Sequence, residues 1–287
     1  MNDAPLEPGT PTVSVVVTTH ATPAPLLAVA LDSLLDQTLP DLEVLLVADG
    51  ALEPEAESLV EVLAGADPRL VVLEPGRVGR ARALNLGWEA ARADLVAIQD
   101  ADDASHPRRL EIQVAQLACL PGVAALGAEA MFVEGVDARP DWDLPDEAPR
   151  TTRIDRAMLW SNPIVHSSLV VRRTALDGVG GYDESRVAQF DYDLYLRLRD
   201  QGWGVARCEL PLVLHRRHPD QFFEGLPPWR RAWSSCRLQL DHIRAEPAPR
   251  RWGYRGVAMA RLGYQMGRGL AWHRAATRAS RGRLGGL

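Results

Sequence analysis

The chain reads Leu95-Val96-Ala97-Ile98-Gln99-Asp100-Ala101-Asp102-Asp103 about one third of the way along its 287 residues. An apolar run that ends abruptly in acids is typical of a buried β-strand whose carboxyl end opens onto a ligand site. Three carboxylates within four positions repel one another, and a divalent cation such as Mg²⁺ or Mn²⁺ removes that repulsion. Because Mg²⁺ usually completes its shell with water and phosphate oxygens, the natural partner is a diphosphate. The alternative is an acidic helix start before Pro107, which accounts for one or two of the aspartates.

The residues before this stretch alternate between strand and helix patterns. Short apolar runs predict strands over 13–18, 42–47 and 70–73, and amphipathic segments predict helices over 23–36, 53–63 and 78–91. Continuously apolar strands separated by helices indicate a parallel sheet that is covered on both faces. Ligands bind at the carboxyl ends of such strands, so we expect Thr18-Thr19-His20, Ala48-Asp49-Gly50 and Asp100–Asp103 to line one crevice.

After Pro107 the pattern loosens into additions to the sheet and a helical tail. We expect strands over 123–133, 168–171, 205–208 and 212–214, helices around 114–117 and over 192–201, a proline- and acid-rich loop over 137–150, and tail helices near 229–244 and 254–277. The predicted fold is therefore α/β, with a mixed sheet, helices on both faces and a helical C-terminal tail.

Charged residues are distributed unevenly along the chain. All 32 basic residues are arginine and the formal net charge is −6. From Leu226 to the end there are thirteen arginines against two acids, so this tail is near +11 and the remainder near −17. We expect a flexible N-terminus (1–12), a main domain over 13–224 with halves 13–103 and 104–224, and an arginine-rich helical extension over 225–287.

Cysteine usage and hydropathy indicate a cytoplasmic protein. The three cysteines show no CxxC spacing, which makes a zinc site or a disulfide framework improbable. The first residues are acidic and proline-rich, unlike a signal peptide, and no apolar run approaches the roughly 18–20 residues that span a bilayer. Arginines and tryptophans in the tail leave peripheral contact with the inner face of the membrane open.

Four motifs together resemble the nucleotide-binding half of a family 2 glycosyltransferase of the GT-A fold. They are Thr18-Thr19-His20, Glu43 to Gly50, Gly79 to Gly87 and Asp100 to Asp103; the likeness continues through Gly180 to Glu184 and Asp191 to Leu194, as far as His218-Pro219. The resemblance implies an enzyme of the hexosyltransferase type that moves a sugar, with inversion, from a nucleotide diphosphate to an acceptor hydroxyl.

The resemblance also assigns the donor side of the site. It implies nucleotide contacts from Thr18, Thr19, His20, Asp49, Arg80 and Asp100. The chain departs from the family pattern at Ala48, where an acid usually reads the base, so Asp49, the backbone or a different base must compensate. A UDP-sugar is favoured on family frequency alone.

Metal, base and acceptor roles follow from the same resemblance. Asp102 is the expected ligand of Mg²⁺ or Mn²⁺, with His218 as a further ligand, and Asp191 is the expected general base beside Phe190, which replaces the usual glutamate. Asn162, His166 and Asp193 are the acceptor-side candidates. Helix capping by Asp191 and solvation of His218 are the structural alternatives.

Two other functions remain open at this stage. Losses at Ala48 and Phe190 would suit a non-catalytic protein that binds nucleotide sugars. The basic tail would suit attachment to a membrane or a nucleic acid, although a lid or a contact in a homo-oligomer explains it equally well. The expected acceptor is a hydroxyl of a glycan, a lipid-linked sugar or a small molecule.

Overall fold

The computed structural model describes residues 9–135, 142, 149–217, 228–243, 248, 251–260 and 262–264. The chain divides into two compact units, residues 1–155 with 163–218, and residues 156–162 with 219–287. The predicted boundary at residue 224 lies outside the described residues and stays a prediction. The same holds for residues 1–8 of the predicted flexible N-terminus and for most of the predicted loop over 137–150.

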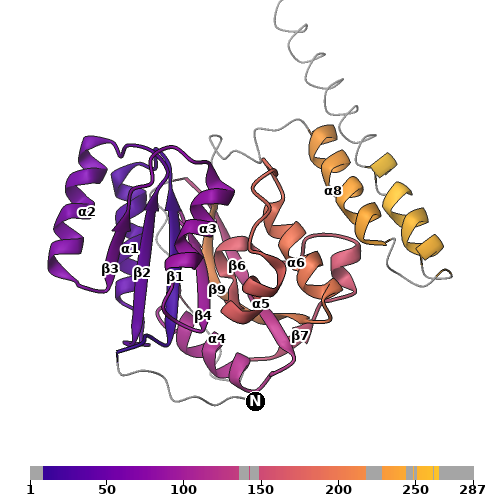
Figure 1. Cartoon of the computed structure of the whole chain (residues 1–287), viewed down its shortest axis with the longest axis horizontal. Coiled ribbons are helices and arrows are strands. Elements are labelled where there is room, and N and C mark those ends of the chain that lie inside the picture. Colours follow the sequence, from indigo (N-terminus) through magenta and orange to yellow (C-terminus); the bar gives the residue numbers. More distant parts are fainter. Residues whose placement is uncertain are drawn as a thin grey trace, which may run out of the picture. The chain divides into compact units, whose positions relative to one another are not determined.

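The first unit is built on a nine-stranded mixed sheet, seen in Figure 1. Its order is β3-β2-β1-β4-β8-β6-β9-β5, with β7 paired to β9. Strands β1 to β4 pair in parallel, and β8 runs antiparallel to both β4 and β6. The strands are β1 (Val13–Thr19), β2 (Leu42–Ala48), β3 (Leu70–Leu73), β4 (Leu95–Asp100), β5 (Ala104–Ser105), β6 (Val123–Glu134), β7 (Thr151–Arg153), β8 (Val170–Arg172) and β9 (Gly204–Arg217).

Helices cover both faces of this sheet, because successive side chains of a strand point to opposite sides. Val15 and Val17 of β1 belong to one apolar cluster with Leu31 of α1. Val16, between them, faces Gly87 of α3, where a β-carbon would overlap the valine side chain. The predicted α/β fold is therefore confirmed. The helices are α1 (Ala24–Leu35), α2 (Pro54–Ala66), α3 (Arg80–Ala90), α4 (Arg109–Ala118), α5 (Arg173–Val179) and α6 (Phe190–Asp200), with a 3-10 turn η2 (His166–Ser168).

The second half of the sheet differs from the prediction in several places, and the short strands β5 and β7 were not predicted. The two short strands expected over 205–208 and 212–214 are one long strand, β9, whose register against β6 shifts beside Pro211. A bulge at that point lets the strand continue past a residue that cannot donate a ladder hydrogen bond. Helix α5 has no counterpart among the predicted elements.

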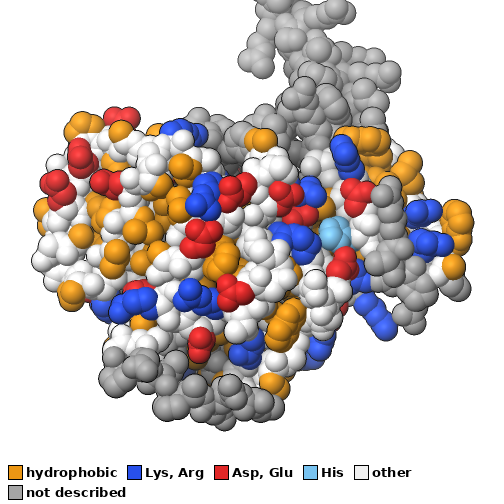
Figure 2. Space-filling model, in the orientation of Figure 1, with side chains coloured by type: hydrophobic (Ala, Val, Ile, Leu, Met, Phe, Trp, Pro, Cys, Tyr) orange, Lys and Arg blue, Asp and Glu red, His pale blue; other side chains and the backbone are white. Residues whose placement is uncertain are grey.

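The second unit is helical. It contains η1 (Ala157–Leu159), α8 (Pro228–Ile243) and helical residues 251–260 and 262–264, called the 251–264 segment. The Gln239 side chain donates to the Trp160 carbonyl at 2.7 Å, and the Trp160 ring meets Tyr254 edge-on at 5.2 Å. Helix α8 confirms the first predicted tail helix. The second begins earlier than predicted, and residues 265–287 lie outside the described part. Figure 2 shows hydrophobic and basic side chains side by side over these helices.

Among the described helices, none is both long and apolar enough to cross a membrane.

Candidate active site

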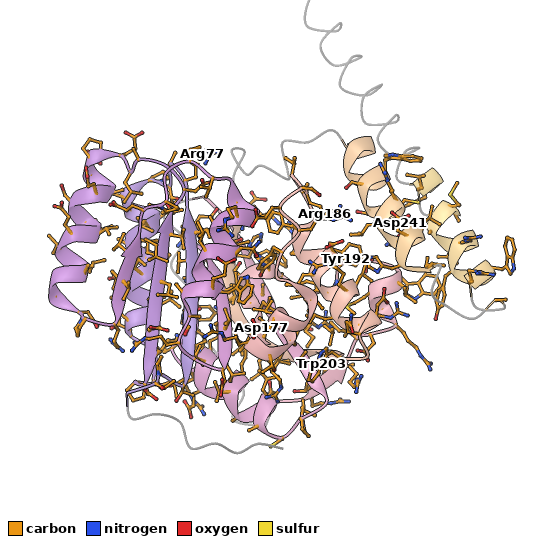
Figure 3. The ribbon with its side chains drawn as sticks, viewed as in Figure 1. Arg77, Asp177, Arg186, Tyr192, Trp203 and Asp241 are labelled. Carbon is orange, nitrogen blue, oxygen red and sulfur yellow. The ribbon has the colours of Figure 1, made fainter. Side chains whose placement is uncertain are left out.

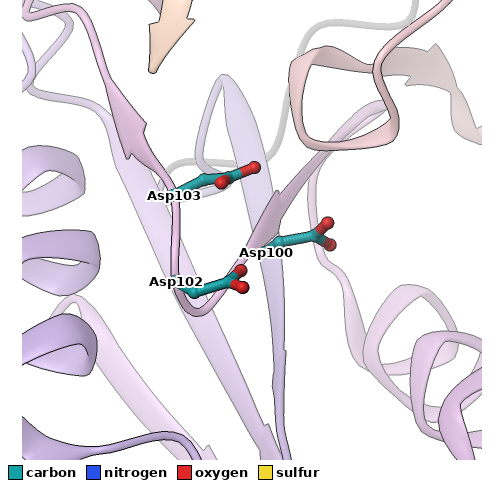
Figure 4. Close-up of side chains that lie close together, drawn as sticks. All are labelled: Asp100, Asp102 and Asp103. Atoms are coloured by element: carbon teal, nitrogen blue, oxygen red, sulfur yellow. The ribbon is translucent and has the colours of Figure 1, made fainter. Parts of the chain in front are cut away.

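Three carboxylates gather where β4 ends. Asp100 closes the strand, and Asp102 and Asp103 follow in a turn that the Asp103 amide closes onto the Asp100 carbonyl at 3.2 Å. One oxygen from each side chain lies within 4.8 Å of the others. Figure 4 shows the three side chains close together. Asp103 is buried, whereas Asp100 and Asp102 are partly exposed. The expected cluster therefore exists, and its two accessible members are those that can meet a ligand.

Asp103 is the structural member of the cluster. Its carboxylate accepts hydrogen bonds from the Ser167 hydroxyl, from His215 Nδ1 at 2.8 Å and from the Arg216 amide at 2.9 Å. Burial raises the pKa of the Asp103 carboxyl, and the hydrogen bond from His215 opposes that shift. With three donors engaged, Asp103 anchors the turn to η2 and β9.

Arg80 supplies positive charge to the cluster. It is the first residue of α3, and its guanidinium pairs with Asp100 while lying 5.6 Å over the ring of Phe190. Burial raises the pKa of Asp100, but the charge and hydrogen bond of Arg80 together with those of His166 outweigh this and hold the pKa well below its usual range. The charges of Asp102 and Asp191 also act on Arg80. One guanidinium thus lies between the carboxylate cluster and the start of α6.

The residues at the end of β1 lie where the sequence predicts. Thr18 pairs in register with Asp100, and Thr19 pairs with Ala48. Thr19 is buried and its hydroxyl has no hydrogen-bond partner within the described residues. His20 is exposed, and its Nδ1 lies 2.9 Å from the Asp49 carbonyl oxygen. The ends of β1, β2 and β4 therefore meet at one edge, while their contacts with a nucleotide stay a prediction.

Asp49 is engaged by the loop that precedes α3. One carboxylate oxygen accepts from the amides of Val78 at 2.7 Å and Gly79 at 2.9 Å, and the other accepts from Arg77 at 2.8 Å. Arg77 is labelled in Figure 3. Through these three bonds Asp49 shapes the loop that presents Arg80. Its contact with the nucleotide stays a prediction.

Helix α6 begins at the predicted base. Gln189 adopts a left-handed conformation (φ 59°), Phe190 opens the helix, and Asp191 is partly exposed in its first turn. The Phe190 ring packs edge-on against the rings of His166 and Tyr182, at 5.8 and 5.9 Å. Phe190 therefore fixes the helix start from which Asp191 projects.

Asp193, predicted on the acceptor side, is buried in an ion-pair network. Its carboxylate oxygens lie 2.7 Å from Arg197 and 2.9 Å from Arg186, which is labelled in Figure 3. Arg197 also donates to the carbonyls of Val179 and Gly181, both at 2.7 Å. The network fastens α6 to the turn that follows α5, so it accounts for Asp193 without any acceptor.

The three remaining candidates fall in different places. His166 lies beside the cluster, with Nε2 3.0 Å from the Tyr182 hydroxyl and Nδ1 3.9 Å from an Asp100 oxygen. Asn162 belongs to the second unit. His218 lies outside the described residues. An acceptor role for His166 or Asn162 and a metal role for His218 stay predictions.

Sequence reasoning missed Arg109, a fully buried guanidinium behind the cluster. It donates to the side chains of Gln99, Ser105 and Gln113 and to the carbonyls of Ile98 and Leu169. Burial lowers the pKa of Arg109 to about 9, and the charges of Asp103 and Asp100 oppose the shift. Arginines in helices are normally exposed, so no pattern marks this one. Its hydrogen bonds to Ile98 and Gln99 hold the end of β4 in position.

Comparison with known proteins gives one family. The sequence profile of Glycosyl transferase family 2 matches residues 14–180, more than half of the chain. O-antigen biosynthesis protein RfbC of Myxococcus xanthus is 31% identical over 239 residues, which make up 76% of this chain and 18% of that protein. Amylovoran biosynthesis glycosyltransferase AmsE of Erwinia amylovora is 27% identical over 224 residues, 78% of this chain and 81% of that protein.

A solved structure shows the same fold. The mannosyltransferase PcManGT from Pyrobaculum calidifontis, in complex with GDP-Man and Mn²⁺, superposes with a TM-score of 0.65 at 24% sequence identity. The match covers 94% of this chain and 76% of that one. The mixed α/β architecture of the first unit is therefore that of GT-A glycosyltransferases.

Proposed function

Because the chain belongs to glycosyl transferase family 2, and is thus a glycosyltransferase, we propose that it transfers a sugar with inversion from a nucleotide diphosphate to an acceptor hydroxyl. One observation carries this proposal: Asp100 and Asp102 lie together at the end of β4, with Arg80 beside them and Asp191 within reach of the Arg80 charge. A site with both acids and a guanidinium suits a donor that brings a metal-bound diphosphate.

The cluster fits Mg²⁺ or Mn²⁺. Such an ion needs one or two protein carboxylates, and the rest of its shell comes from water and substrate phosphates. Asp103 is already engaged, so Asp102 would be the main ligand, with Asp100 next to it. When bound, the ion supplies positive charge that stabilises the leaving diphosphate. The solved structure of PcManGT with Mn²⁺ and GDP-Man supports a metal-dependent donor site of this type.

The residues of the site indicate the nucleobase of the donor less clearly than they indicate its diphosphate. Ala48 offers no side-chain acceptor, and the Asp49 carboxylate already accepts from two amides and Arg77. Thr18, Thr19 and His20 remain at the same edge as polar contacts for base and ribose. The resemblance favours UDP, whereas the structural neighbour holds GDP-Man, so both nucleotides belong in the first donor panel.

Asp191 is the proposed general base. Inversion requires a group that takes the acceptor proton as the hydroxyl oxygen attacks the anomeric carbon from the side opposite the diphosphate. Asp191 stands at a helix start whose position is fixed by Phe190 and by the buried Asp193 network. Arg80, which pairs with Asp100 and is acted on by the charge of Asp191, would donate to the departing phosphates.

The experiment measures release of nucleoside diphosphate from UDP- and GDP-sugars, with Mn²⁺, Mg²⁺ or a chelator. We expect metal-dependent release from one donor that is abolished in Asp102→Ala and falls by about 10²–10⁴-fold in Asp191→Asn. Asp177→Asn is the matched control, because this aspartate is exposed on α5 away from the cluster.

Two results would contradict the proposal. Donor that binds by calorimetry and is never turned over, with any acceptor tried, would make the chain a non-catalytic binder. A product whose anomeric configuration, read by NMR, matches that of the donor would exclude inversion and with it the role of Asp191 as a base.

A further inference from the structure

The 251–264 segment exposes an apolar face. Eight of its described residues are exposed, namely Trp252, Gly253, Gly256, Val257, Met259, Ala260, Gly263 and Tyr264, and none of the eight carries a charge. At 3.6 residues per turn they fall on one half of the helix. Residue 261 lies outside the described part. Trp252 and Tyr264 are each 66% exposed and Met259 is 52% exposed. A water-facing helix normally carries its charged residues on this side.

The opposite side of the segment is accounted for within its own unit. Ala258 and Leu262 are buried, and the Cys236 thiol of α8 lies 3.8 Å from the Ala258 carbonyl. Because this side packs against α8, the exposed face is a second, separate apolar surface.

An arginine borders the exposed face. Arg255 is partly exposed at its edge, and its guanidinium lies 5.5 Å over the Trp252 ring. On α8, Trp233 is 55% exposed and Arg237 follows one turn later, also exposed. Pairing of an arginine with an exposed tryptophan is typical of side chains that sit at a bilayer interface, with the ring at headgroup depth and the charge toward phosphate.

We propose that the apolar face of the 251–264 segment binds the surface of an anionic phospholipid bilayer, lying in its plane. Helices that do so combine a face of Trp, Leu or Phe type with basic residues along its border. The tail from Leu226 onward, with its thirteen arginines and two acids, supplies the attraction to anionic headgroups. This inference goes beyond sugar transfer and does not depend on it.

Two other occupants fit the surface less well. A second copy of the chain would bring together two tails that are each near +11, and like charges at close range repel. A nucleic acid needs guanidinium groups along the contact face to meet its phosphates, whereas the described residues of this face are uncharged.

The test is co-sedimentation of the full chain with vesicles of phosphatidylcholine alone or with phosphatidylglycerol. We expect binding to the anionic vesicles that weakens as salt is raised. The variant Trp252→Ala/Met259→Ala/Tyr264→Ala should lower the partition coefficient by about tenfold or more. The control Val62→Ala/Val71→Ala removes exposed apolar side chains from α2 and β3 and should bind as the wild type does.

Four results would overturn the proposal that this face binds a bilayer. Unchanged vesicle binding in the triple variant, with a wild-type melting temperature, would overturn the assignment of this face, as would the absence of binding to anionic vesicles. A dimer of the wild type that the triple variant abolishes, or tighter binding to DNA or RNA than to vesicles, would also overturn it. Release of nucleoside diphosphate by the triple variant should equal that of the wild type, which separates this proposal from the proposed function.

Discussion

Arg80 and a bound metal ion compete for the same negative charge, and this yields a measurable expectation. Arg80 pairs with Asp100 and acts on Asp102, so in the donor-free protein it partly neutralises the acids that would hold the ion. Replacement by methionine, Arg80→Met, keeps most of the side-chain length and removes the charge. We expect the variant to bind Mn²⁺ more tightly than the wild type in the absence of donor.

The size of the effect follows from Coulomb's law. Two unit charges 4 Å apart interact by roughly 4 kcal/mol at an effective dielectric constant of about 20, and a divalent ion doubles the repulsion. Because the Arg80 side chain is 46% exposed, solvent screening reduces the net effect to about 1–2 kcal/mol. The dissociation constant for Mn²⁺ should therefore fall by roughly five- to thirtyfold.

Free Mn²⁺ is titrated by its electron paramagnetic resonance signal, a readout that does not depend on catalysis. In parallel, kcat/KM for the donor should fall by about tenfold or more, since a guanidinium–phosphate contact is lost. Arg82→Met is the matched control, because Arg82 on the same helix pairs with Glu89 and Glu184 instead. Unchanged or weaker Mn²⁺ binding in Arg80→Met would refute the competition.

Three further predictions concern the scaffold. Gly87→Ala should destabilise the fold by about 1–3 kcal/mol in urea denaturation, because its β-carbon overlaps Val16, and a second change, Val16→Ala, should recover most of the loss. Asp193→Asn should cost about 3 kcal/mol by leaving Arg197 without its buried charge partner, and an unchanged melting temperature would contradict this. Arg109→Met should cost about 3–5 kcal/mol, since five acceptors lose their donor, and calorimetric unfolding measures it.

The nucleotide-binding half of the fold could be predicted because its signals are local. The runs at 13–18, 42–47, 70–73 and 95–98 are continuously apolar, and each becomes a parallel strand within two residues of the expected bounds. The strand ends converge for the same reason, so the meeting of Thr18 with Asp100 followed from topology alone.

The second half was harder because its elements depend on distant partners. Strand β9 continues past Pro211 because a bulge in its pairing with β6 accommodates the proline. The residues near Pro211 carry no signal that predicts this pairing. Helix α5 spans only seven residues, too few to show a helical period.

The roles of individual side chains were the hardest features to predict from the sequence. The acids at 49, 103 and 193 are indistinguishable in sequence from ligand-binding ones. In the structure, each of these carboxylates is bonded to groups that lie elsewhere in the sequence. Asp49 accepts hydrogen bonds from loop amides, and Asp103 accepts them from Ser167 and His215. Asp193 pairs with two arginines.

The bonds of Asp103 also set an order of events while the chain is made. Its partners Ser167 and His215 lie 64 and 112 residues downstream, so a ribosome-bound chain that ends before β9 has Ser167 but lacks His215 and the Arg216 amide. A buried carboxylate that lacks two of its three donors is costly, so this turn should settle only after β9 has emerged and docked. The parallel strands β1 to β4 can pair much earlier in synthesis. Capacity for donor binding would then arrive as one of the last steps of folding, and an incomplete chain would not sequester nucleotide sugars.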